Sequence, residues 1–278
     1  IAASVLGPFG GDPMVIQSGA SAGENLWIQN AALLWVPFII VAAIAAWFGM
    51  NDIASATSSF SDQAVIFKRK HTWLMCWLYL GAFGSFIGFA AGFPLLSGML
   101  FKDVDPTQYA FIGPLLGALA RPAGGVIADK LGGARVTLWT FAVMIAGVVG
   151  VLQFLPGEES AGNFWGFFGM FLVLFVASGI LNGSTFRMVP VMFMTLRQRA
   201  LGDTEQAQVE GNREAAAVLG FISAIAAYGG FFIPKAYGTS FDMTGGVAAA
   251  LTGFVVFYVT CLFVTWWYYA RRGAEVPC

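Results

Sequence analysis

Apolar stretches of 20 or more residues recur along this chain, and they leave it few possible folds. Each stretch is long enough to cross a hydrocarbon core of about 30 Å as a helix. Helices are required, because an isolated strand cannot satisfy its backbone hydrogen bonds in lipid. We therefore predict an all-α membrane protein with seven helical spans, near residues 28–50, 72–96, 109–128, 136–155, 164–193, 215–237 and 247–270.

The composition argues against several classes of function. Only 10% of the residues are charged, against about 25% in an average soluble domain. The net charge of −1 gives no sign of a nucleic-acid partner. Cys76, Cys261 and Cys278 are isolated in the sequence, and His71, the only histidine, falls in a predicted loop. These spacings suit neither a metal site nor a catalytic triad, so we expect no cofactor, no metal and no enzyme activity.

Basic residues gather in alternate predicted loops, whereas the loops between them hold only Lys102 and Lys235. By the positive-inside rule the basic loops face the cytoplasm, so the C-terminus is also cytoplasmic and the chain crosses the plasma membrane several times. One of these loops is a charged stretch that we predict over residues 196–213. The basic side carries ten of the 14 lysines and arginines: Lys68, Arg69, Lys70, Lys130, Arg135, Arg197, Arg199, Arg213, Arg271 and Arg272.

The third span carries a permanent charge, Arg121, near its middle. It lies about 12 residues, or ~18 Å of helix, beyond Tyr109. Small residues recur on the same helical face, which favours close helix packing and turns Arg121 toward the bundle. All 15 acidic residues fall in predicted loops or at span ends, so none is placed to neutralise it. We interpret Arg121 as an anion ligand, with a structural arginine bonded to backbone carbonyls as the alternative.

Two other spans bring unusual side chains to the same depth. In the second span an aromatic row that begins with Tyr79 and Phe83 is suited to line a cavity, although ordinary packing also explains it. In the fifth span the run from Asn182 to Thr185 brings polar side chains into an apolar helix, either for a ligand or for interhelical hydrogen bonds. Arg187, nearer the cytoplasmic end, is expected to snorkel or to gate.

The turn GGVIADKLGGAR after the third span resembles the loop signature of the major facilitator superfamily. The matching positions include Gly125, Asp129, Lys130, Gly132 and Arg135, which the resemblance identifies as a conformational latch on the cytoplasmic side. At finer grain the chain resembles the NarK-type nitrate/nitrite porters. The similar segments are WFGMND at Trp47, YLGAFGSFIGFAAGFPLL at Tyr79, GALARPAGG at Gly117, GNFWGFF at Gly162, LNGSTFRM at Leu181 and LGFISAIAAYGGFFIPKAYG at Leu219.

The family resemblance implies a major facilitator fold of which this chain supplies the C-terminal half. It implies a truncated helix five with its extracytoplasmic loop over 1–27, helix six over 28–50, a cytoplasmic loop between the halves over 51–71, a six-helix bundle over 72–270 and a cytoplasmic tail over 271–278. It further implies that the N-terminal half supplies a second arginine, and that the substrate-binding residues in this chain are Arg121, Tyr79, Phe83, Asn182, Gly183 and Ser184.

The function implied is exchange of nitrate for nitrite by alternating access of the two halves. Three alternatives stay open: a proton-coupled nitrate symporter, a major facilitator for another small anion, and a membrane scaffold fragment without transport activity. The expected partners are nitrate, nitrite, the lipid bilayer and the missing N-terminal half. The lack of an acidic residue within a predicted span argues against a cation substrate and against proton coupling through this part of the chain.

Overall fold

The computed structural model describes residues 14–15, 25–26, 33, 35–50, 63–157 and 161–278. The chain forms two units, Ile1–Ser58 and Ser59–Cys278. In the first unit β1 (Met14–Val15) pairs antiparallel with β2 (Asn25–Leu26), and α3 (Val36–Gly49) follows. No residue of α3 is buried although its sequence is almost entirely apolar, as expected of a helix that faces lipid or another protein surface. The predicted end of helix five lies almost wholly outside the described residues.

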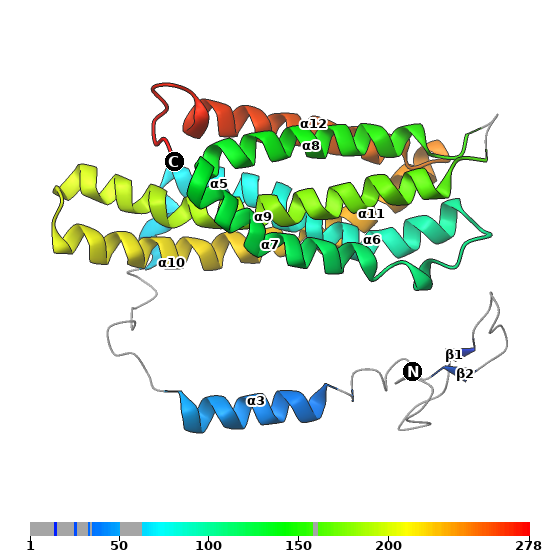
Figure 1. Cartoon of the computed structure of the whole chain (residues 1–278), viewed down its shortest axis with the longest axis horizontal. Coiled ribbons are helices and arrows are strands. Elements are labelled where there is room, and N and C mark those ends of the chain that lie inside the picture. The colour runs from blue at the N-terminus through cyan, green and yellow to red at the C-terminus, as the bar shows by residue number, and fades with distance from the viewer. Residues whose placement is uncertain (1–13, 16–24, 27–32, 34, 51–62, 158–160) are drawn as a thin grey trace. The chain divides into compact units, whose positions relative to one another are not determined.

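The second unit is a bundle of six long helical segments (Figure 1). Two of them contain a π-helical stretch, η3 and η5, and short 3-10 helices η2 (Ala64–Lys68) and η4 (Pro106–Gln108) lie between segments. The bounds are α5 (Lys70–Tyr79), η3 (Leu80–Gly84) and α6 (Ser85–Leu100); α7 (Ile112–Leu131); α8 (Gly133–Gln153); α9 (Phe164–Leu201); α10 (Glu205–Ala227) and α11 (Gly229–Thr244); α12 (Ala248–Thr265) and η5 (Trp266–Ala270).

Five of these segments are long and apolar enough to cross a membrane. The sixth, α7, is long enough at 20 residues but carries Arg121, Asp129 and Lys130. The all-α prediction is confirmed, and each predicted span from the second to the seventh coincides with one segment. The chain is thus a multi-pass membrane protein.

The helix α9 lies at the centre of the bundle, where it contacts α7, α8 and α10. Glycines allow its close approach to α7. A Cβ atom added at Gly117 would lie 2.7 Å from the Phe175 carbonyl oxygen, and one added at Gly124 would lie 2.8 Å from the carbonyl carbon of Ile180. These distances leave no space for a side chain, so the predicted stripe of small residues is the surface of α7 that packs on α9.

Aromatic rings from α6 and α9 pack against one another in the core. Phe93 of α6 is buried and packs against Phe167 and Phe171, with ring centroids 5.9 and 5.1 Å apart. Phe86 makes an edge contact with Phe175 at 6.2 Å. Of the two interpretations of the aromatic row, ordinary packing holds for these later members, which lie in or against the protein core.

Parts of two predicted loops are helical instead. Residues 196–213 mostly continue α9 and α10, and only residues 202–204 connect the two helices. Thr204 caps α10 by accepting a hydrogen bond from the Ala207 amide at 3.2 Å. These stretches are rich in helix-forming Arg, Gln, Glu and Ala, so both helices extend beyond their apolar spans. His71 was predicted in a loop but lies buried in the first turn of α5, where Nδ1 is 3.0 Å from the Tyr269 hydroxyl.

Candidate anion-binding site

Tyr79 and Phe83, two of the side chains around Arg121, lie where the helix changes type. The α-helix α5 ends at Tyr79, and the next turn, η3, is π-helical before α6 resumes. Such a turn shifts the side chains that follow it relative to an uninterrupted α-helix, and it occurs often at functional sites. The Tyr79 and Phe83 rings stack with centroids 5.5 Å apart and an interplanar angle of 23°. Tyr79 is buried and Phe83 half-buried.

Arg121 approaches this ring pair from α7. Its guanidinium carbon lies 5.4 Å from the centroid of the Phe83 ring, within the range of a cation–π interaction. The side chain is half-buried, and it forms no ion pair with any carboxylate in the described part of the chain. Pro122 follows directly inside the helix and lacks the amide that would bond the preceding turn. The charge is therefore held beside an aromatic face without a counter-ion.

Asn182 of α9 is the fourth side chain of this group. The Tyr79 hydroxyl donates a hydrogen bond of 3.0 Å to Asn182 Oδ1, and both side chains are buried. Arg121 and Ser223 are also close enough to the Tyr79 hydroxyl to interact with it. The Asn182 amide nitrogen is buried without a partner among the residues that the structure describes. A buried donor left unpaired costs about 1–3 kcal/mol, so this position favours a ligand with an acceptor oxygen.

The next two residues of α9, Gly183 and Ser184, add no side chain to this group. A Cβ atom on Gly183 would collide with the Arg121 carbonyl oxygen, so this glycine allows α9 to approach the Arg121 backbone. Ser184 is buried against α8, where its hydroxyl lies 2.8 Å from Thr137 Oγ1 and bonds the Leu181 carbonyl at 3.1 Å. The structure thus brings together Arg121, Tyr79, Phe83 and Asn182, and it does not bring Ser184 to them.

The residues of the predicted latch lie in the C-terminal part of α7 and at the start of α8. Asp129, in the last turn of α7, forms an ion pair with Arg187 of α9, and both side chains are about half exposed. Sequence reasoning considered these two residues separately, because 58 positions separate them. Gly132 joins α7 to α8 with φ of +89°, a conformation that favours glycine. The Gly125 amide nitrogen lies against Gly183, so Gly125 belongs to the α7–α9 contact.

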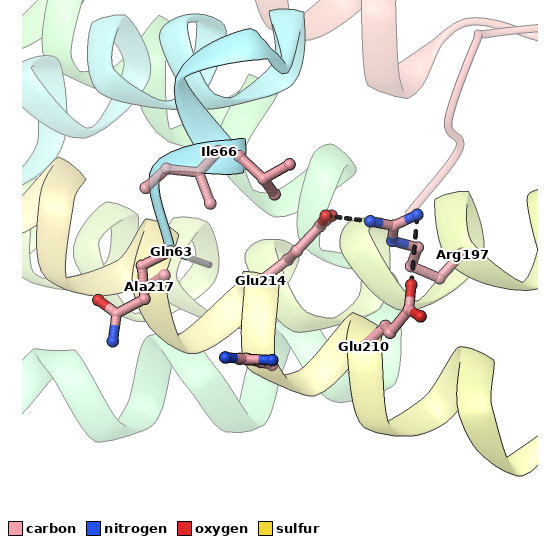
Figure 2. A pocket seen from close by; sticks show the side chains of 8 residues that line it. Gln63, Ile66, Arg197, Glu210, Glu214 and Ala217 are labelled. Carbon is pink, nitrogen blue, oxygen red and sulfur yellow. Dashed lines mark hydrogen bonds and ion pairs between the residues drawn. The ribbon is translucent and has the colours of Figure 1, made fainter. Parts of the chain in front are cut away.

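A second group of charges was missed by sequence reasoning. Glu214 of α10 is buried and forms ion pairs with Arg197 of α9 and, at 3.1 Å, with Arg69. Arg197 also pairs with Glu210 at 3.4 Å. Arg197, Glu210 and Glu214 border a cavity of about 310 Å³ next to Ile66 (Figure 2). The prediction that Glu210 lies in a loop is wrong, because α10 begins at Glu205; Glu214, the residue before the predicted sixth span, lies in the same helix. Neither pairs with Arg121.

Comparisons with known proteins show what the chain as a whole is similar to. No family model matches the chain. It is 51% identical over 254 residues to a nitrate/nitrite transporter, NarU, of Salmonella typhimurium, which covers 90% of this chain and 55% of that protein. It is 36% identical over 280 residues to a probable nitrate/nitrite antiporter, NarK2, of Thermus thermophilus, which covers 99% of this chain and 59% of that protein. The chain spans about half the length of the curated relatives it matches, and these relatives are transporters.

A solved structure shows the fold. The crystal structure of the major facilitator superfamily transporter FucP in the outward conformation matches the model with a TM-score of 0.52 and 13% sequence identity. The match covers 86% of this chain and 54% of that transporter. At this identity the likeness concerns the arrangement of helices alone. The chain therefore has the architecture of roughly one half of a major facilitator.

Proposed function

The chain is homologous to the NarK-type nitrate/nitrite transporters of the major facilitator superfamily, and we propose that it forms the C-terminal half of such a transporter. Nitrate and nitrite are then the substrates, and the N-terminal half is the partner with which this bundle encloses them. The proposal places the protein in the plasma membrane with the end that carries Lys130, Arg197 and Arg271 toward the cytoplasm. The excess of basic residues at that end supports this orientation.

The observation that carries the proposal is the environment of Arg121. The guanidinium has no counter-ion among the described residues and lies near the Tyr79 hydroxyl, which also bonds Asn182. The Asn182 amide nitrogen is buried and unpaired, so both groups offer N–H donors to a small anion. The fork of a guanidinium matches two oxygens of a planar oxyanion. Phe83 and Tyr79 would border the anion with apolar surface and exclude water. In this proposal Arg121 and Asn182 bind the anion, Gly183 allows α9 to approach, and Ser184 positions α9 against α8.

Transport would proceed by alternating access, with the two halves rocking about the bound anion. The site and the Asp129–Arg187 pair connect the same two helices, α7 and α9, at different heights. The pair is suited to act as a latch that holds these helices together in one of the two states. Anion binding would neutralise Arg121, which removes the cost of enclosing an unpaired charge and so favours closure.

We further propose that the transporter exchanges nitrate for nitrite. An exchanger changes between its two conformations only with an anion bound, so the charge of Arg121 is neutralised during each change. A proton-coupled symporter would instead use a titratable group to reset the site. In the described residues the carboxylates nearest the bundle interior, such as Glu214, are paired with arginines at the basic end of the helices and lie apart from Arg121.

Nitrate uptake into vesicles that contain the transporter tests this proposal. With the pH gradient clamped, we expect uptake to require internal nitrite, and we expect Arg121→Ala to abolish it. Lys235→Ala removes one exposed charge from α11 and serves as the matched control. Uptake that ignores internal nitrite but follows an imposed pH gradient would reject exchange in favour of symport. Uptake of acetate or formate without competition by nitrate would reject the proposed substrates.

A further inference from the structure

A cavity at the basic end of the bundle has no part in the anion site. It has a volume of about 540 Å³ and lies between the α7–α8 turn and the segment that follows η5. Four cationic side chains line it, and no carboxylate side chain does: Lys130 and Arg135 come from the turn, and Arg271 and Arg272 from the C-terminal segment. The C-terminal segment closes one wall, where the Ala134 amide donates a hydrogen bond of 2.9 Å to the Cys278 carbonyl.

These cations are not neutralised by the protein. Lys130, Arg135 and Arg272 form no ion pair or side-chain hydrogen bond with any residue in the described part of the chain. The neighbouring acid, Asp129, is already paired with Arg187. Arg271 stacks on Trp267 at 4.2 Å from the ring centroid, and its Nε bonds the Trp267 carbonyl at 2.9 Å. Four like charges around one cavity repel each other, so the cavity favours an anion.

The surface next to the cavity is apolar. Leu131, which also lines the cavity, is 61% exposed, and Val126, one turn and a half earlier on α7, is 55% exposed. On the other side of the cavity Trp266 and Trp267 of η5 are also exposed. Exposed tryptophans at the end of a membrane-spanning helix are typical of the lipid headgroup level. An anion with an attached hydrocarbon chain would use both the cations and this apolar border, whereas free phosphate would use the cations alone.

We propose that this cavity binds the phosphate headgroup of an anionic phospholipid, with the acyl chains lying along Leu131 and the exposed face of α7. Basic pockets between membrane helices are suited to such headgroups. The lipid would join the α7–α8 turn to the C-terminal segment by bonding cations from both. This inference rests on the membrane-spanning arrangement in the proposed function, but it does not depend on nitrate as the substrate.

Native mass spectrometry of the transporter that carries this chain tests the proposal. The purified protein is supplied with phosphatidylglycerol or with zwitterionic phosphatidylcholine, and retained lipid is counted. We expect preferential retention of phosphatidylglycerol. One cation near a membrane surface contributes about 1 kcal/mol, or roughly fivefold in affinity, so Arg272→Ala should weaken this retention about fivefold. Arg272 is exposed and has no partner among the described residues, so this variant should leave the fold intact.

Three further measurements make the test decisive. Arg272→Lys retains the charge and should retain the lipid, and Lys235→Ala, which removes a charge outside the cavity, should have no effect. Equal retention of both lipids by the unmodified protein, or equal losses in Arg272→Ala and Lys235→Ala, would overturn the proposal. Displacement of phosphatidylglycerol by millimolar inorganic phosphate would identify a site for free phosphate instead. Because lipid retention is measured without nitrate, failure of this proposal would leave the transport proposal standing.

Discussion

Two arginines of this bundle, Arg121 and Arg197, meet very different surroundings. Arg197 bonds Glu214 and Glu210 and shares Glu214 with Arg69, so each buried charge at that end has an opposite charge beside it. Arg121 faces the Phe83 ring and lies near the Tyr79 hydroxyl, and no carboxylate in the described stretches of the chain pairs with it. The comparison suggests that the first arrangement serves to hold helices together, whereas the second serves to receive an anion from outside the protein.

The largest expected effect is on stability, at the paired arginines. Glu214→Gln keeps the shape of the side chain but removes the counter-ion that Arg69 and Arg197 share. Breaking a fully buried pair costs about 3–5 kcal/mol, and we expect the lower end, about 3 kcal/mol, because Arg69 is partly exposed and Arg197 keeps Glu210. We expect the free energy of unfolding in detergent to fall by that amount while the protein that remains folded keeps its nitrate affinity.

The matched control for this variant is Glu205→Gln. Glu205 lies exposed in the first turn of the same helix, and exposed substitutions usually change stability by about 0.5 kcal/mol or less. Similar losses in the two variants would mean that the Glu214 ion pairs contribute no more than an exposed carboxylate, and the contrast between the two arginines would then have no energetic basis.

The second effect concerns Arg121 and should be opposite in kind. Arg121→Ala removes the charged donors of the site, each worth about 2 kcal/mol or more, so nitrate affinity should fall at least about 30-fold. Stability should stay the same or rise, because an unneutralised, partly desolvated cation is lost. Isothermal titration with nitrate and thermal unfolding of the same preparation would measure both quantities.

Arg121→Lys sharpens this prediction. The ammonium keeps the charge but lacks the planar fork, so affinity should recover only in part. Full recovery would show that the site recognises charge alone. A loss of stability in Arg121→Ala comparable with that of Glu214→Gln would make Arg121 a structural arginine, which is the alternative that its sequence position left open.

A smaller effect separates Asn182 from its neighbour Ser184. Asn182→Ala removes the unpaired amide and the acceptor of the Tyr79 hydroxyl, which should weaken nitrate binding about tenfold, or ~1.4 kcal/mol. Ser184→Ala should change affinity much less, because its hydroxyl bonds Thr137 and the Leu181 carbonyl. Thr185→Ala, whose hydroxyl bonds only carbonyls of its own helix, is the control. Equal losses at Asn182 and Ser184 would mean that α9 turns in the nitrate-bound state.

Much of this fold follows from the sequence because one physical requirement dominates it. A chain in lipid must satisfy its backbone within each helix, so the length and position of apolar stretches predict the spans. Close packing of α7 on α9 was predictable for a similar reason, since Gly117 and Gly124 remove the side chains that would keep the helices apart. The unpaired state of Arg121 followed from the positions of the acids relative to these spans.

The parts that sequence reasoning missed depend on contacts between distant segments. No sequence pattern marks the π-helical turn η3, because it is defined by its backbone hydrogen bonds. The Glu214 ion pairs join α10 to α9 and to Arg69, which lies between η2 and α5. His71 is buried by Tyr269 and Glu275 from the far end of the chain. The orientation of Ser184 depends on where α8 lies. No local pattern encodes these choices, because each is decided by a neighbour many residues away.

The Asp129–Arg187 pair offers an intermediate case between the two arginines. Its side chains are about half exposed, so water screens the attraction. A double-mutant cycle with Asp129→Asn and Arg187→Gln should give a coupling free energy of about 0.2–1 kcal/mol in unfolding experiments. In transport the same cycle should change the rate of conformational exchange more than nitrate affinity. A coupling above about 3 kcal/mol would place this pair with the buried ion pairs of Glu214 instead.

The smallest expected effect is a dependence of C-terminal docking on pH. The Lys70 ammonium, which bonds Glu275 at 2.6 Å, holds the pKa of the Glu275 carboxyl below its usual range. A carboxyl with a lowered pKa stabilises the docked segment above the unfolded pKa of about 4.3, and this contribution is lost as the pH falls through the lower, docked pKa. Exposed ion pairs contribute 0–1 kcal/mol, so acidification should raise hydrogen exchange of the Ala134 amide by about fivefold or less, after correction for the intrinsic rate. Glu275→Gln should remove this pH dependence. If the variant shows the same response to acid, another group causes the response, and C-terminal docking does not depend on the Lys70–Glu275 ion pair.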